Sequence, residues 1–343
     1  MSRVYFKPIS SYPERDTISQ TARDLLEHLI AEEHISLEKE VPLKVHFGEK
    51  GNTTYITPDN FTGIISFLKE KGLSSSYIET NAVYSGERKR EKEHRALARR
   101  HGFTQLPVRI ADGERGHEFD EIEIAQTYFD RCKIAKGFAS FRQLIIISHF
   151  KGHRLAGYGG ALKQLAMGFA SRGGKFEQHA DSKPLIVPFR CKKCGACLKH
   201  CPVDAIDIGF FPRINKKKCI GCASCIAVCP HGAILFNVFK LNLMKKFRCK
   251  MAEYALAARK GRSLLFITFA FNLTRGCDCE GTVMEPVARD IGLFASTDPV
   301  AIDAACLDYT DRQEGKTVFK GREILEHAEK IGVGSREYSL IQL

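Results

Sequence analysis

Eight of the thirteen cysteines fall into two copies of one spacing, Cys-x2-Cys-x2-Cys-x3-Cys-Pro. The first copy is Cys191, Cys194, Cys197 and Cys201, and the second is Cys219, Cys222, Cys225 and Cys229. Thiolates at this spacing are the ligands of proteins that hold two 4Fe–4S clusters, in which the fourth cysteine of each run ligates the other cluster. We therefore predict one cluster on Cys191, Cys194, Cys197 and Cys229, and a second on Cys219, Cys222, Cys225 and Cys201.

Zinc and disulfides are the alternatives for these eight thiols. A zinc site typically uses two Cys-x2-Cys pairs and needs no third cysteine two residues further on. Disulfides require an oxidising compartment, which nothing in the sequence indicates. Two tandem copies of a four-cysteine spacing favour clusters over both.

A second group of reactive side chains follows an apolar run at residues 144–147. His149, His153 and Lys163 could transfer protons and bind a carboxylate or phosphate, and we predict them as catalytic residues. Gly157, Gly159 and Gly160 would let the backbone approach a bound group closely, beside the unpaired N–H groups of a helix start. The sequence thus predicts a site for a small anionic ligand, with a turn carrying surface basic residues as the alternative.

Cys277 and Cys279 form a third candidate, with a single residue between them. In an extended segment both thiols would point to the same side, as the ligands of one metal ion do. The pattern leaves open a further metal, a redox role or two free thiols in a surface loop. Asp298 precedes Pro299, the pattern of a helix N-cap.

The elements that must position these groups alternate between strands and helices. Strands are expected at residues 41–47, 77–80, 108–111, 144–147, 264–271 and 291–295, with helices between them. This alternation predicts an α/β domain with a mostly parallel sheet and helices on both sides. We expect residues 1–187 and 239–343 to form that domain and residues 188–238 to be inserted into it as an α+β two-cluster ferredoxin-like domain.

Charge and composition limit the partners. The net charge is +12, and residues 188–238 contribute +6 of it, which two anionic clusters would largely cancel. The basic run at 88–100 alternates with glutamates and indicates a solvated helix, so we expect no nucleic acid. No apolar run is long enough for a membrane span or a signal peptide, and we expect a cytoplasmic protein that contacts no membrane.

The combined motifs resemble the uncharacterised iron–sulfur-centre proteins of the domain-of-unknown-function-362 family. The motifs are the segments 149–153 and 157–168, both cysteine runs, Cys277-Asp278-Cys279, and the segments 290–292 and 298–303. A fainter resemblance, over residues 153–168, is to the nickel-pincer lactate racemases, in which a lysine matching Lys163 contacts the pincer cofactor. This chain departs from them by carrying Ala161 and Leu162 before the lysine, so that cofactor is not carried over.

Three functions remain open from the sequence. The first is an oxidoreductase whose clusters relay electrons between a redox partner protein and a site near His149, His153 and Lys163. The second is a non-enzymatic electron carrier or docking partner of another oxidoreductase. The third is a non-redox enzyme in which the clusters are structural.

Overall fold

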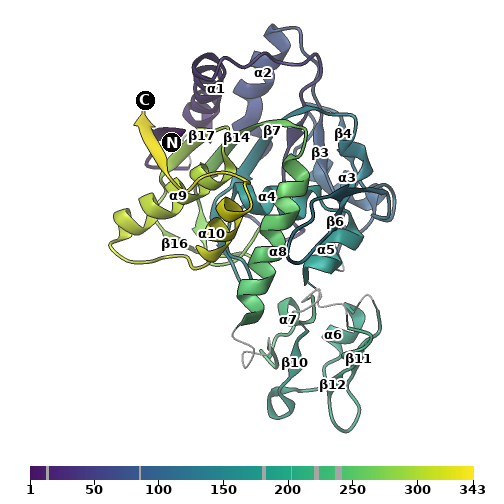
Figure 1. Ribbon diagram of the computed structural model, residues 1–343. Coiled ribbons are helices and arrows are strands. Elements are labelled where there is room, and N and C mark those ends of the chain that lie inside the picture. The colour runs from purple at the N-terminus through teal and green to yellow at the C-terminus, as the bar shows by residue number, and fades with distance from the viewer. Residues whose placement is uncertain (13–14, 85, 180–182, 202, 220–223, 236–241) are drawn as a thin grey trace.

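A computed structural model describes residues 1–343 except 13–14, 85, 180–182, 202, 220–223 and 236–241. A large α/β body carries both chain ends, and a smaller cysteine-rich part lies at one end of it (Figure 1). None of the described helices is long and apolar enough to cross a bilayer.

The body is built on one eight-stranded sheet with a mixed but mostly parallel arrangement. Only β17 runs against its neighbours, because it pairs antiparallel with both β1 and β14, whereas the other strand pairs of the sheet are parallel. This confirms the predicted α/β class with a mostly parallel sheet. In spatial order the strands are β18 (Tyr338–Gln342), β1 (Ser2–Pro8), β17 (Gly292–Ser296), β14 (Ser263–Ala270), β7 (Gln143–His149), β2 (Leu43–Lys44), β3 (Tyr77–Glu79) and β4 (Val108–Ile110).

The two central strands show why the sequence forms this sheet. All seven residues of β7 are buried, as are seven of the eight residues of β14. Such apolar, β-branched runs suit a strand that is covered on both faces. Along β7 the side chains alternate, so that Leu144 and Ile146 belong to one core cluster and Ile145 and Ile147 to the other.

Helices cover both faces, as predicted. One core cluster includes residues of the first three helices, and the other includes residues of α4, α8, α9 and α10. Asp298 caps α9 through the amides of Val300 and Ala301, which confirms the expected N-cap. The helices are α1 (Arg15–Glu32), α2 (Thr62–Glu70), α3 (Glu91–Arg100), α4 (Ala161–Phe169), α5 (Arg172–His179), α8 (Asn242–Arg259), α9 (Pro299–Glu314) and α10 (Glu323–Lys330), with 3-10 turns η1 (Pro58–Phe61) and η2 (Lys136–Phe138).

Several strands differ from the expectation. The strand at 41–47 shrinks to two residues, and β1 and β18 were not predicted at all. The glycine-rich segment after β7 is a hairpin of β8 (Lys151–His153) and β9 (Gly157–Gly159) rather than a loop. Two further hairpins are β5 (Phe119–Glu123) with β6 (Arg131–Ala135), and β15 (Leu273–Thr274) with β16 (Pro286–Ala288).

Residues 185–235, which we call the cysteine-rich unit, have a small core of their own. Its first and last strands pair antiparallel, with Leu185 opposite Leu235, so the two ends of the unit lie side by side. Its elements are β10 (Leu185–Ile186), η3 (Pro188–Arg190), α6 (Ala196–Lys199), β11 (Ile206–Asp207), β12 (Arg213–Ile214), α7 (Ser224–Ala227) and β13 (Ile234–Leu235).

Adjacent ends suit a segment inserted into another domain. We therefore expect that replacing residues 189–236 by a short glycine–serine linker leaves a folded α/β body. Differential scanning calorimetry should then show one cooperative transition, since both core clusters of the body lie outside the deleted segment. A soluble product without such a transition would contradict the insertion.

Candidate functional site

A large cavity of about 790 Å³ lies where the parallel strands end. Glu79 ends β3, and Lys163 and Lys175 come from the helices that follow β7. The opposite wall includes His200 and Cys229 of the cysteine-rich unit. Open α/β sheets usually bind ligands at the carboxyl ends of their strands, so this cavity is the candidate site.

Lys163 projects from the first turn of α4, and its Nζ donates to Cys277 Sγ at 3.1 Å. Burial lowers the pKa of Lys163, but the neighbouring sulfurs of Cys277 and Cys279 outweigh burial and hold that pKa above its ordinary value. The ammonium therefore stays charged at neutral pH, and it lines the cavity.

The two predicted histidines occupy different places. His153 lines the cavity, and its Nδ1 accepts from the amides of Leu155 (3.3 Å) and Ala156 (3.0 Å). Burial, followed by the charge of Lys163, lowers the pKa of His153 to about 3, so the ring is neutral. A neutral ring that accepts at Nδ1 carries its proton on Nε2.

His149 lies behind the cavity wall and is 7% exposed. Its Nδ1 lies 2.9 Å from the Asp278 carboxylate, and its Nε2 lies 2.7 Å from Phe271 O. The Asp278 carboxylate also accepts from Lys151 Nζ at 2.8 Å. With both nitrogens engaged, His149 positions the segment around Asp278, and its predicted role in proton transfer has no support from this placement.

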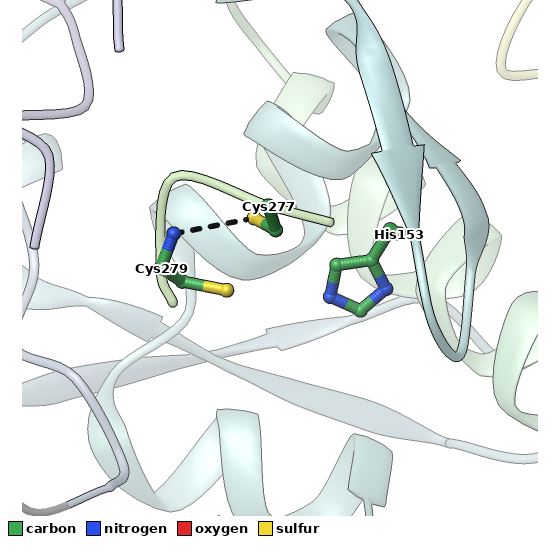
Figure 2. A group of neighbouring side chains, drawn as sticks. All are labelled: His153, Cys277 and Cys279. Atoms are coloured by element: carbon green, nitrogen blue, oxygen red, sulfur yellow. Dashed lines mark hydrogen bonds between the residues drawn. The ribbon is translucent and has the colours of Figure 1, made fainter. Parts of the chain in front are cut away.

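Cys277 and Cys279 lie in a turn rather than in an extended segment, because Glu280 N donates to Cys277 O at 2.8 Å. Both thiols still approach the same point. Cys279 N donates to Cys277 Sγ at 3.5 Å, and Figure 2 shows the two sulfurs and the His153 ring around one space. These three residues form a group that could hold a metal ion.

The glycines of the hairpin and helix start are packed against protein. A Cβ on Gly157 would lie 2.0 Å from Lys320 O, and a Cβ on Gly160 would lie 2.3 Å from Asp303 Oδ1. Gly159 lies close to the side chains of Lys163 and Lys151. The contacts at Gly157 and Gly160 are too close for a side chain, so these two glycines are explained by packing alone.

The amides at the start of α4 are already occupied. Asp303, from α9, accepts from Ala161 N at 2.7 Å and from Leu162 N at 3.0 Å. The expectation that these N–H groups are unpaired and bind an anion is therefore wrong for both. No local pattern in the sequence indicates that Asp303, about 140 residues further along the chain, caps the start of α4.

Charged residues that the sequence analysis missed complete the cavity wall. Glu79 Oε1 lies 2.8 Å from Lys44 Nζ, and Arg88 lies between Glu79 and Glu49. Lys175 Nζ donates to three neutral oxygens, on Thr80, Asn81 and Ala170. Burial lowers the pKa of Lys175 to about 8, so it retains a positive charge at neutral pH. The one available signal was that Glu79 is a charged residue near the end of a short expected strand.

The cysteine-rich unit brings one predicted ligand set together. Cys191, Cys194, Cys197 and Cys229 all line one small hollow. Cys201, Cys219 and Cys225 belong to the same small core, whereas Cys222 lies outside the described residues. Backbone amides reach the fourth cysteine of each run, with Ala205 N 3.2 Å from Cys201 Sγ and Ala233 N 3.3 Å from Cys229 Sγ. A soft four-sulfur donor set with N–H contacts to sulfur fits an iron–sulfur cluster.

Comparison with known proteins gives a family, and the solved structures that resemble the chain include two distant ones. The model described as "Domain of unknown function (DUF362)" matches residues 41–308. No curated protein matches the chain. A crystal structure of a Thermotoga maritima protein has a TM-score of 0.44 at 11% identity, over 89% of this chain and 60% of that one.

The lactate racemase apoprotein of Thermoanaerobacterium thermosaccharolyticum has a TM-score of 0.40 at 10% identity, over 87% of this chain. This chain spans only 55% of the racemase and 60% of the Thermotoga protein. Likenesses this distant say nothing about what the present chain binds or does.

Proposed function

This chain belongs to the DUF362 family, and for this member we propose an iron–sulfur redox function. In this proposal residues 188–238 are a ferredoxin-like domain that binds two 4Fe–4S clusters. The clusters would supply one-electron transfer between a redox partner protein and a site on the α/β body. The protein would then act as an oxidoreductase on a small anionic ligand bound in the cavity.

One observation carries the proposal. Cys229 lines the small hollow shared by Cys191, Cys194 and Cys197, and it also lines the large cavity that contains Lys163 and Cys279. The residues that would hold one cluster therefore border the space in which a ligand would bind. A bare electron carrier has no need of such a cavity.

The charges of the cavity support an anionic ligand. The cations Lys163, which is half-buried, and Lys175, which is buried, both line it. Lys175 donates only to neutral oxygens among the contacts described above. A carboxylate or phosphate would give these cations a charged partner.

The surface of the cysteine-rich unit supports an acidic redox partner. Phe189, Phe210 and Phe211 expose 82%, 85% and 71% of their surfaces. Lys193 lies over the Phe210 ring, 5.8 Å from its centroid, and Cys194 is exposed in the same unit. Aromatic side chains beside cations suit docking of an acidic electron-transfer protein close to a cluster.

The cluster assignment is tested by pairs of substitutions. Anaerobically reconstituted protein should contain about eight irons and eight sulfides. The double variant Cys191→Ser/Cys229→Ser should retain about four irons, because both serines affect the same cluster in the crossed arrangement. Cys191→Ser/Cys201→Ser should lose both clusters. Iron analysis and electron paramagnetic resonance of the reduced proteins measure this.

The opposite pattern, in which the Cys191/Cys229 pair loses both clusters and the Cys191/Cys201 pair keeps one, would replace the crossed arrangement by a local one. About four irons in the unsubstituted protein would contradict two clusters altogether.

The redox role is tested separately by stopped-flow reduction with dithionite, with and without oxalate or inorganic phosphate. Reduction kinetics that change when an anion occupies the cavity support an oxidoreductase. The same reduction rate with and without the anion supports a simple electron carrier.

A further inference from the structure

The group of His153, Cys277 and Cys279 borders the cavity, because His153 and Cys279 line it and the buried Cys277 lies beside them. One ligand atom of each residue lies within 4.8 Å of the others. His153 ends the first strand of the β8–β9 hairpin, and the two cysteines flank Asp278 in the turn after β15. Figure 2 shows the ring and both sulfurs directed into one space.

The neighbours hold each donor in place. Cys277 Sγ accepts from Lys163 Nζ and from Cys279 N, and both contacts offset negative charge on a thiolate. The two amides on His153 Nδ1 fix the ring and occupy that nitrogen. A metal ion would bind Nε2 in place of its proton, which would be released to solvent, and the two amides would stabilise the resulting imidazolate.

Asp278, between the two cysteines, points to the other side of the turn. Its carboxylate is bound by His149 at 2.9 Å and by Lys151 at 2.8 Å, and the residue is fully buried. This buried carboxylate holds the turn in which the thiols of Cys277 and Cys279 approach His153. Neighbours that orient ligands in this way are a regular part of metal sites.

We propose that His153, Cys277 and Cys279 bind a single thiophilic divalent metal ion of the zinc class, with an open coordination position toward the cavity. Two sulfurs and an imidazole nitrogen suit zinc and similar transition metals, and they exclude magnesium and calcium, which prefer oxygen. Among the described residues the group has no fourth member, and three protein ligands are typical of zinc sites that leave one position for water or substrate.

The metal ion would give the cavity a second positively charged group beside Lys163, and its open position could bind an anion. His153 and Cys279 both line the cavity, so an anion bound there would meet the metal ion. The site shares no residue with the eight cluster cysteines. It can therefore be right or wrong independently of the proposed redox function.

The test uses the full chain with its clusters reconstituted and zinc as the probe. Equilibrium dialysis with elemental analysis should find one zinc per chain while the iron content stays constant. X-ray absorption at the zinc edge, which does not report on iron, should show two sulfurs at about 2.3 Å and nitrogen or oxygen at about 2.0–2.1 Å.

Cys277→Ser, Cys279→Ser and His153→Ala should each weaken zinc binding at least about tenfold, since even partners outside the coordination sphere matter by that much. The matched control is Cys306→Ala, which removes a buried free thiol in α9 and should leave zinc binding unchanged. Because Cys277 is fully buried, Cys279→Ser and His153→Ala keep the test valid if Cys277→Ser fails to fold.

Two results would overturn the site. One is zinc surrounded by four sulfurs, which would place it on the cluster cysteines. The other is an unchanged zinc affinity in both Cys279→Ser and His153→Ala with the iron content intact.

Discussion

Replacing Glu79 by alanine should lower the free energy of unfolding by about 3–5 kcal/mol, because it leaves a buried charge without its partner. Glu79 is 3% exposed, and its carboxylate lies 2.8 Å from Lys44 Nζ. Lys44 is fully buried, and without Glu79 its described acceptor is the carbonyl oxygen of Val45 at 2.9 Å. Urea unfolding followed by circular dichroism measures the loss.

The pH dependence gives this prediction a sign. Burial holds the pKa of Lys44 below its ordinary value of 10.5, against the opposing effect of Glu79. Between those two pKa values the unfolded chain binds more protons than the folded one, so the free energy of unfolding rises with pH in that window. Loss of Glu79 lowers the pKa of Lys44 in the folded protein further. The pH range over which stability rises with pH therefore begins at a lower pH. The difference in free energy of unfolding between Glu79→Ala and the unsubstituted protein should therefore shrink as the pH is raised toward 10.5.

Glu70→Ala is the matched control. Glu70 accepts two hydrogen bonds from Arg23, at 2.8 and 2.6 Å, but 56% of its side chain is exposed. A surface pair of this kind contributes at most about 1 kcal/mol. Equal losses in the two variants would mean that Glu79 does not compensate a buried charge.

Lys163→Met should weaken binding of a small anion in the cavity by about ten- to a hundredfold. A hydrogen bond to a charged group contributes about 1.5–3 kcal/mol, and 1.4 kcal/mol corresponds to a factor of ten. Methionine keeps an unbranched apolar stem but removes the charge. Calorimetric titration should use whichever of oxalate, other small carboxylates and inorganic phosphate binds the unsubstituted protein most tightly.

Lys50→Met serves as the control, because Lys50 also lines the cavity but 72% of its side chain is exposed. It should change anion affinity much less than Lys163→Met does. Iron content should be unaltered in both variants. If Lys163→Met and the unsubstituted protein bound the anion equally well, Lys163 would not bind the anion and would have only a structural role beside Cys277.

The sequence predicted the elements whose signals are local. The apolar runs of β7 and β14 depend on neighbouring residues alone, and both strands form as expected. The strands β1 and β18 pair with each other across nearly the whole chain, and no short pattern reports such a partner. The reversed direction of β17 depends in the same way on its neighbours β1 and β14.

The candidate site was predicted only in part, because its local motifs can be recognised in the sequence but the placement of each side chain depends on distant segments. The sequence singled out His153, Lys163, Cys277 and Cys279, and the fold brings them together. It could not tell that His149 faces Asp278 instead of the cavity. That distinction depends on which side of β7 His149 occupies and on the position of Asp278 in a turn that was expected to be extended.

The position of β7 has a consequence for how the chain is made. In the folded protein β7 lies between β2 and β14, and β14 is encoded after the whole cysteine-rich unit. On the ribosome one edge of this strand, whose central residues 144–147 are all apolar, therefore stays unpaired while the unit is synthesised. An unpaired apolar edge is a template for aggregation. The growing chain is thus most vulnerable in the interval when its cysteines first emerge, and chaperones that bind nascent chains would act on it then.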